Sequence, residues 1–170
     1  MSITPINIYK TPNGAIFDNP KNRRFILWRT WSIEGPFLLF IGINPSTAGE
    51  SENDPTISRL INVAKEWNYA GFFMINLFSW VSSKRNYKMT GEKIEEIENS
   101  YMEWAEKLAD TIIFMWGNDG HKYPEIVEKM MSKFPISFCF GQNRNGQPSH
   151  PLYLPGPLSL KPFNRKKLWE

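Results

Sequence analysis

Three polar side chains follow one short apolar run, and their types suit hydrogen bonding to a polar ligand. Leu38–Ile43 ends in Asn44-Pro45-Ser46-Thr47, so a carboxamide and two hydroxyls come directly after a predicted buried strand. Gly42 permits close backbone approach, and Pro45 favours an extended Asn44. A carboxamide orients water and donates or accepts hydrogen bonds, but it cannot act as a general base. The alternative is that the stretch is simply one turn of an α/β domain.

Further candidates follow other apolar runs. Asn76 and Phe78 end the run that starts at Phe72, and Gly117 ends the run that starts at Thr111. Residues 142–150 form a polar loop that finishes at His150. Because ligands bind at the carboxyl edge of open α/β sheets, we expect Gly42, Asn44, Ser46, Thr47, Asn76, Phe78, Gly117 and His150 to gather there. Core packing for Phe78, a loop or cap role for His121 and a disordered loop at 142–150 remain open alternatives.

The elements that position these residues are predicted by hydrophobic periodicity. Buried strands are predicted at 38–43, 72–77, 111–116 and 136–140, and amphipathic helices at 55–67, 90–108 and 124–133. Strand formers at 24–31 and 15–17 predict antiparallel additions, and the short link at 34–36 favours 24–31 as the antiparallel neighbour of 38–43. The sequence therefore predicts a three-layer α/β/α fold, with a mainly parallel central sheet and antiparallel N-terminal strands.

Charged residues between these elements are predicted at the surface. Arg23, Arg24 and Arg29 are expected to be solvated or paired. The stretch from Trp80 to Thr90, with Lys84, Arg85 and Lys88, is predicted to be a basic surface excursion.

Composition sets broad limits. The 170 residues are 41% hydrophobic and 15% aromatic, which predicts one ordered domain over 1–170. The net charge of +3 permits nucleic acid or phosphate partners without requiring them, and the basic residues are expected to be dispersed among 17 acidic ones. With one cysteine, Cys139, and two histidines, neither an intrachain disulfide nor a structural zinc site is expected. We expect a cytoplasmic protein without a cofactor or membrane segment, and the oligomeric state stays open.

Three motifs, in this order along the chain, resemble the uracil-DNA glycosylase superfamily. They are Phe40-Ile41-Gly42-Ile43-Asn44-Pro45, Ile113-Phe114-Met115-Trp116-Gly117 and His150-Pro151-Leu152. The mismatch-specific branch of that superfamily has a strand ending in Gly-x-Asn-Pro. A closer resemblance, over nearly the whole chain, is to bacterial and phage domains of unknown function. It rests on Asn44-Pro45-Ser46-Thr47-Ala48, Asp54-Pro55-Thr56, Asn76-Leu77-Phe78 and the segment 150–155.

The superfamily resemblance implies roles for single residues. Asn44 matches the residue that holds the attacking water, and His150 matches the histidine that hydrogen-bonds a pyrimidine O2 as the glycosidic bond breaks. By position, Phe78 would stack on a flipped base and Asn76 would read a base edge. Ser46 and Leu152 depart from the family motifs, and Asn44 stands where the classical branch has an aspartate. The resemblance therefore implies a slow glycosylase.

Three functional hypotheses follow. The first is hydrolysis of an N-glycosidic bond on a flipped base or a nucleoside. The second is binding of a nucleotide, a modified base or a nucleotide signal through Ser46, Thr47, backbone amides and basic residues. The third is a phage or host interaction protein that reuses the fold.

Overall fold

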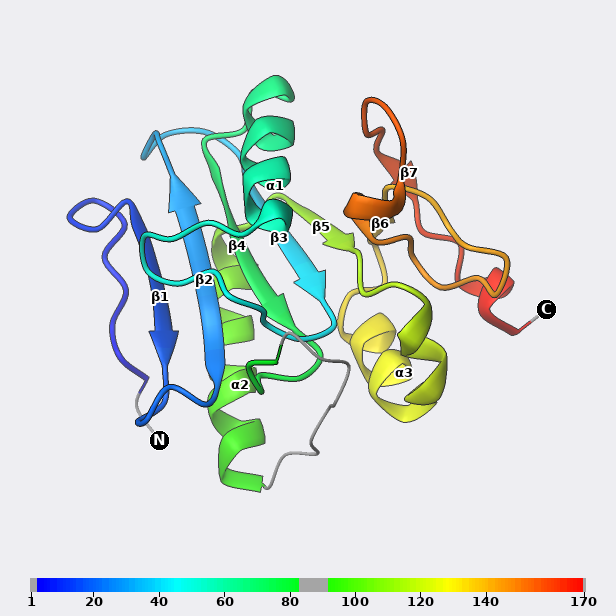
Figure 1. Cartoon of the computed structure of the whole chain (residues 1–170), viewed down its shortest axis with the longest axis horizontal. Helices are drawn as coiled ribbons and strands as arrows, with labels where there is room; N and C mark the ends of the chain where they lie inside the picture. The colour runs from blue at the N-terminus through cyan, green and yellow to red at the C-terminus, as the bar shows by residue number, and fades with distance from the viewer. Residues whose placement is uncertain (1–2, 83–91, 170) are drawn as a thin grey trace.

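A seven-stranded sheet organises the computed structural model, which describes residues 3–82 and 92–169 (Figure 1). The strands are β1 (Asn13–Phe17), β2 (Arg24–Thr30), β3 (Phe37–Gly42), β4 (Gly71–Asn76), β5 (Thr111–Phe114), β6 (Phe138–Cys139) and β7 (Lys161–Pro162). Their order in the sheet is β1-β2-β4-β3-β5-β6-β7. The neighbours from β4 to β6 pair in parallel, and β1, β2 and β7 pair antiparallel.

Helices cover both faces of this sheet, as the predicted three-layer α/β/α fold requires. Figure 1 shows α1 (Pro55–Glu66) in front of the sheet and α2 (Glu92–Leu108) behind it, with α3 (Pro124–Lys133) beyond the end of β5. One core cluster joins α1 to the sheet through Ile57, Leu60 and Ala64, with Phe40 and Phe72 from the strands. The other cluster joins α2 and α3 to the opposite face. The helices keep the predicted spacing because each buries one apolar stripe.

One predicted pairing is wrong. β2 is antiparallel, but its partner is β4 rather than β3, and β4 lies between them. The link from Trp31 to Pro36 passes around the start of β4, where Trp31 N and Ser32 N donate to Ala70 O and Ala70 N donates to Pro36 O. These bonds let a short connection step across one strand, so a short link did not enforce adjacency here.

Short 3₁₀ helices follow the strands near the carboxyl edge and at the C-terminus. They are η1 (Asn118–Lys122), η2 (Pro151–Tyr153) and η3 (Arg165–Trp169). Most of the predicted basic excursion from Trp80 to Thr90 lies outside the described residues, as does the start of the helix predicted over 90–108. Within the described ranges, no helix has the length and apolar character needed to cross a lipid bilayer.

Candidate functional site

A cleft of about 500 Å³ opens at the carboxyl edge of the sheet. The ends of β3, β4 and β5 and the segment around η2 contribute to its wall. Six of the residues singled out from the sequence line it: Gly42, Asn44, Ser46, Asn76, Gly117 and His150. Thr47 is exposed and is not among the described lining residues. The volume is within the range typical of small-molecule sites.

Two hydrogen bonds from its amide nitrogen orient the Asn44 side chain. Its Nδ2 donates to Ser82 O at 2.7 Å and to Pro45 O at 3.1 Å. The carbonyl Oδ1 accepts no hydrogen bond from a described residue, and Asn44 lines the cleft while half-buried. The side chain therefore stabilises its loop through the nitrogen and keeps its oxygen as an acceptor for a ligand or a water.

His150 has a defined tautomer. The Leu152 amide donates to His150 Nδ1 at 3.2 Å, which caps η2. An accepting Nδ1 carries no proton, so the neutral ring carries it on Nε2. Of the two ring nitrogens, Nε2 is therefore the hydrogen-bond donor.

Arg59 of α1 holds the segment that carries His150. Its guanidinium donates to Pro151 O, to Leu154 O at 2.9 Å and to Gly156 O at 2.8 Å. Three backbone carbonyls on one arginine fix this segment against α1. The position of His150 thus depends on a residue more than 90 positions earlier in the sequence.

Arg24 and Asn76 meet in the wall of the cleft. Arg24 is 2% exposed and donates through Nη1 to Ala48 O at 3.0 Å and through Nη2 to Asn76 Oδ1 at 3.4 Å. Burial lowers the pKa of Arg24 to about 10; Asp54 raises it and Arg29 lowers it further. The guanidinium therefore stays charged at neutral pH. Arg24 Nε and Asn76 Nδ2 are buried and have no hydrogen-bond partner among the described residues.

Gly42 makes room for this arrangement. A Cβ at Gly42 would lie 2.8 Å from Asn76 Nδ2 and 3.0 Å from Met74 Cε. The absence of a side chain at Gly42 thus lets Asn76 approach β3, consistent with the close backbone approach expected from the sequence.

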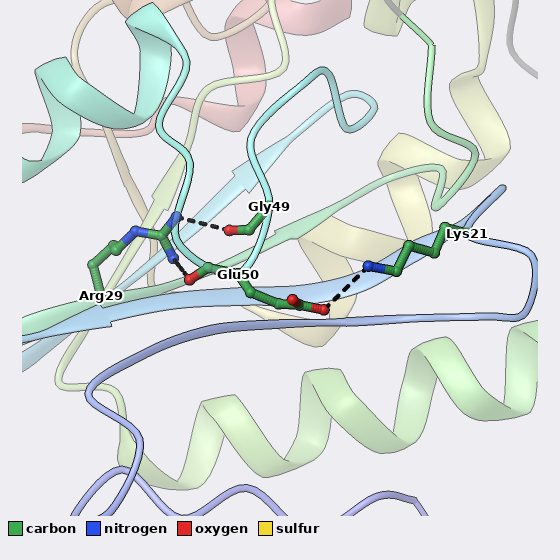
Figure 2. Close-up of polar contacts among 4 residues, drawn as sticks. All are labelled: Lys21, Arg29, Gly49 and Glu50. Atoms are coloured by element: carbon green, nitrogen blue, oxygen red, sulfur yellow. Dashed lines mark hydrogen bonds and ion pairs between the residues drawn. The ribbon is translucent and has the colours of Figure 1, made fainter.

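Arg29 fixes the loop between β3 and α1 (Figure 2). Its guanidinium donates to Gly49 O at 2.8 Å, Glu50 O at 3.2 Å and Glu52 O at 3.1 Å. Figure 2 also shows Lys21 paired with the Glu50 carboxylate, at 3.4 Å. Burial lowers the pKa of Arg29, and Glu52 and Asp54 raise it.

Of the two expected alternatives, solvated or paired, Arg24 and Arg29 are paired rather than solvated, because both are buried and hydrogen-bonded. Both donate to backbone carbonyls of the β3–α1 loop, so their charges are satisfied by the chain itself. Arg23 is paired, since it donates to Ser79 Oγ at 3.1 Å and its guanidinium lies 5.2 Å from the Trp80 ring centroid.

The loop at residues 141–149 is held by hydrogen bonds to the end of β5. Gly117 has a φ of +78° and donates to Pro148 O at 2.9 Å. Trp116 Nε1 donates to Gln147 Oε1 at 2.7 Å. Asn143 Nδ2 donates to Asn118 Oδ1 and its Oδ1 accepts from Ser149 Oγ, both at 2.8 Å. These bonds make the loop an ordered wall of the cleft rather than a disordered crossing.

Phe78 has a different position from the one expected of a stacking residue. It is 1% exposed, its ring lies 4.7 Å from the Tyr123 ring in an edge-to-face contact, and it is not among the residues that line the cleft. This position fits the core-packing alternative. Tyr153 instead lines the cleft, is 74% exposed and lies 5.5 Å from the His150 ring. Sequence reasoning missed this role, although an aromatic three residues after His150 was the available signal.

The charged residues that line the cleft do not suit a phosphate. Among the described residues they are Arg24, Asp54 and Asp119. Asp54 Oδ1 accepts from Ile57 N at 2.8 Å as the cap of α1, and Asp119 pairs with Lys122 at 3.0 Å. Within the described part of the lining, one buried cation thus faces two carboxylates, an arrangement that favours a neutral polar ligand over an anion.

Positive charge gathers instead beside the cleft. Residues 134–169, which we call the C-terminal basic lobe, contain five basic and no acidic side chains, whereas residues 1–133 contain 15 basic and 16 acidic ones. The lobe includes the 141–149 loop, β7 and η3, coloured yellow-orange to red in Figure 1. Gln142 Oε1 accepts from Asn164 N at 2.9 Å, which joins the loop to the chain before η3. The expected dispersal of basic among acidic residues therefore holds for residues 1–133 and fails for residues 134–169, and counting charge by segment would have shown this.

The Cys139 thiol is buried in the core. Cys139 is 1% exposed, and burial raises the pKa of its thiol, so it does not serve as a nucleophile.

Metal binding depends on the positions of ligand side chains. Across residues 3–82 and 92–169, no three His, Cys, Asp or Glu side chains gather in a way that could hold a metal ion.

Comparison with known proteins gives one match. No curated protein and no solved structure matches the chain significantly. A protein family does match, from the first residue of β2 to the middle of η2. The match covers residues 24–152, and the chain therefore belongs to the family described as "Protein of unknown function (DUF1643)".

Proposed function

We propose that this protein recognises a nucleobase in the cleft and hydrolyses the N-glycosidic bond that joins the base to its sugar. The observation that carries the proposal is a fixed acceptor and a fixed donor in one cleft of about 500 Å³. Asn44 Oδ1 is the acceptor because its nitrogen is bound to backbone carbonyls, and His150 Nε2 is the nitrogen that carries the proton because Nδ1 accepts from Leu152.

The two groups suit complementary parts of such a reaction. A water that donates to Asn44 Oδ1 attacks the anomeric carbon, and its oxygen forms the new bond there. The carbon–nitrogen bond breaks, and the base leaves with the electron pair. His150 Nε2–H donates to an oxygen of the departing base anion, which then takes a proton from solvent, while the attacking water loses one to solvent. Such a donor contributes on the order of a hundredfold in rate.

The charges favour a base over a phosphate as the occupant of the cleft. Asp54 and Asp119 line it together with the buried Arg24, and both carboxylates would oppose an entering phosphate. A neutral planar base avoids this cost. Tyr153, exposed beside His150, offers a ring on which such a base can stack.

The C-terminal basic lobe supports a polynucleotide rather than a free base as the substrate. Arg144, Lys161, Lys166 and Lys167 are exposed in a segment without acidic residues, and the 141–149 loop of the same lobe contributes Asn143 and Ser149 to the cleft. Phosphates of a strand would lie on this lobe while one base enters the cleft.

A second candidate is recognition of a base without hydrolysis. It is favoured by the carboxamide at Asn44, which orients water but cannot remove its proton. The same cleft and the same lobe would then hold a modified or unpaired base.

The test combines two assays on the purified protein. Base release is measured from uracil-, hypoxanthine- and mismatch-containing strands, single and double, and thermal shift is measured with free bases, nucleosides and nucleotides. Release supports hydrolysis; a shift with bases or nucleosides but no release supports recognition alone. A thermal shift with nucleotides alone would show that binding requires a phosphate, and it would contradict the proposal that the cleft recognises a neutral base. Silence in both assays would leave an interaction protein as the surviving account.

A further inference from the structure

A second cavity, of about 510 Å³, lies between α2 and α3 at the carboxyl end of β4. Its lining includes Ile75, Leu77 and Phe78 from the sheet side, Met102 from α2 and Met130 from α3. We call it the interhelical cavity. Methionine side chains are flexible and adapt to the shape of an apolar guest. Arg24 and Asn76 line both this cavity and the cleft, so the two spaces are adjacent but otherwise separately lined.

Three carboxyl groups also line the cavity, those of Glu95, Glu98 and Glu103. Glu98 of α2 lines the cavity, and its Oε1 is buried without a hydrogen-bond partner among the described residues. Burial raises the pKa of Glu98, while hydrogen bonds from Ser79 and the charge of Arg23 lower it. A buried carboxyl oxygen without a donor is unfavourable, and a bound donor relieves that cost.

The lysines of the cavity are held by other acids. Lys129 pairs with Glu95, and Lys133 lies 3.4 Å from Glu106 and 3.8 Å from Glu103. These ion pairs join α3 to α2 along the rim. Among the described lining residues, they leave Glu98 as the acid with an unsatisfied oxygen.

We propose that the interhelical cavity binds a small apolar amine, whose ammonium group pairs with Glu98 and whose hydrocarbon part packs against Met102 and Met130. The ammonium group would donate to Glu98 Oε1, the carboxyl oxygen that lacks a donor among the described residues. A charge-assisted hydrogen bond in an apolar surrounding is among the strong ones. This inference does not depend on the function proposed for the cleft.

The methionines provide a direct test by NMR of ¹³C-methyl methionine in the whole protein. Met102 and Met130 report on the cavity, and Met74 and Met115 report on the cleft. The probe is 2-phenylethylamine, and 2-phenylethanol is the uncharged control of the same shape. We expect the amine to shift the Met102 and Met130 signals at concentrations at least tenfold below those the alcohol requires. Equal responses to the two probes, or shifts confined to Met74 and Met115, would overturn the proposal.

A variant pair isolates the carboxylate. Glu98→Gln is expected to weaken amine binding at least tenfold and to leave alcohol binding unchanged, whereas Glu96→Gln, at an exposed position of α2, changes neither. The pH dependence of amine binding is measured on the wild-type protein, so this test does not depend on whether Glu98→Gln folds. Amine affinity is expected to rise from pH 5 to pH 7.5, because Glu98 must ionise to form the pair while the amine stays protonated. Affinity that is flat with pH, or unaltered in Glu98→Gln, contradicts the assignment.

Discussion

At the scale of single residues, two side chains of the cleft each combine an observed structural contact with a second group to which we assign a chemical role in the proposed function. His150 accepts through Nδ1 to cap η2, and the neutral ring therefore carries its proton on Nε2. Asn44 donates through Nδ2 to hold its loop, and its Oδ1 accepts from none of the described residues. Alanine at either position therefore removes both roles at once, and loss of function with such a variant does not distinguish them. Substitutions that keep one role are needed.

His150→Asn is such a substitution. Asparagine is a favoured capping residue, so its Oδ1 can accept from the Leu152 amide in place of Nδ1, while the Nε2 donor disappears. We expect a melting temperature close to that of the wild type and a fall in base release on the order of a hundredfold. His150→Ala should lose the same activity and also about 1 kcal/mol of stability. Activity retained in His150→Asn would show that the histidine is only an anchor.

Glu98 predicts a pH dependence of stability. Its pKa is raised in the folded protein, so the folded state holds a proton that the unfolded state has released over the same range. The stabilising effect is complete below the unfolded pKa and is lost as the pH rises through the folded pKa. Thermal unfolding measured from pH 4.5 to pH 7.5 should therefore show this component in the wild type, and Glu98→Gln should lack it. Identical pH profiles for the two proteins would contradict the burial argument.

At the scale of elements, most strands and helices could be predicted from the sequence, and their neighbours could not. β3 and β4 are continuous apolar runs and lie within one residue of the predicted bounds, and α3 agrees at both ends. Local periodicity carries no information on which strand β2 pairs with. The arginine contacts could not be predicted from local sequence patterns either, because Arg24 donates to Ala48 O and Arg29 donates to Gly49 O across more than 19 residues.

Phe78 shows why the predicted site was incomplete. Alternation along a strand would place Asn76 and Phe78 on the same side. In the structure, the consecutive amides of Leu77 and Phe78 both donate to the β3 chain, at Gly42 O and Ile43 O. A regular strand directs only alternate amides to one neighbour, so alternation ends here. Leu77 and Phe78 therefore both enter the core under α2 and α3, and Phe78 leaves the cleft.

Arg59→Met tests how α1 positions the His150 segment. Methionine keeps an apolar stem and removes the donors to Pro151 O, Leu154 O and Gly156 O. We expect a loss of about 1–3 kcal/mol in the free energy of unfolding and faster hydrogen exchange confined to residues 150–156. Glu66→Met, at the exposed last position of the same helix, is the control and should change neither. Unchanged exchange in Arg59→Met would mean that the segment is held by other contacts.

At the scale of the whole molecule, the distribution of charge is more informative than its sum. A net charge of +3 is small, but the C-terminal basic lobe carries five positive side chains and no negative ones. Arg165 pairs with Glu128, so the remaining exposed cations are Arg144, Lys161, Lys166 and Lys167. They share the lobe with the loop that forms one wall of the cleft, which places a positively charged surface beside a cleft whose described charges disfavour anions.

This arrangement predicts salt-dependent binding of a single-stranded oligonucleotide. Each phosphate that the lobe neutralises contributes about −0.7 to the slope of log affinity against log salt concentration, because bound counterions are released. The double variant Lys166→Glu, Lys167→Glu should weaken binding and make that slope shallower by about 0.7 for each phosphate that the variant no longer neutralises. The matched control is Lys10→Glu, Lys107→Glu, which changes the net charge equally at exposed positions outside the lobe, in the N-terminal segment and at the end of α2. Fluorescence anisotropy of a labelled oligothymidine measures both slopes. If the control weakens binding as much as the lobe variant, the attraction is a property of the net charge, and the lobe is not the binding surface.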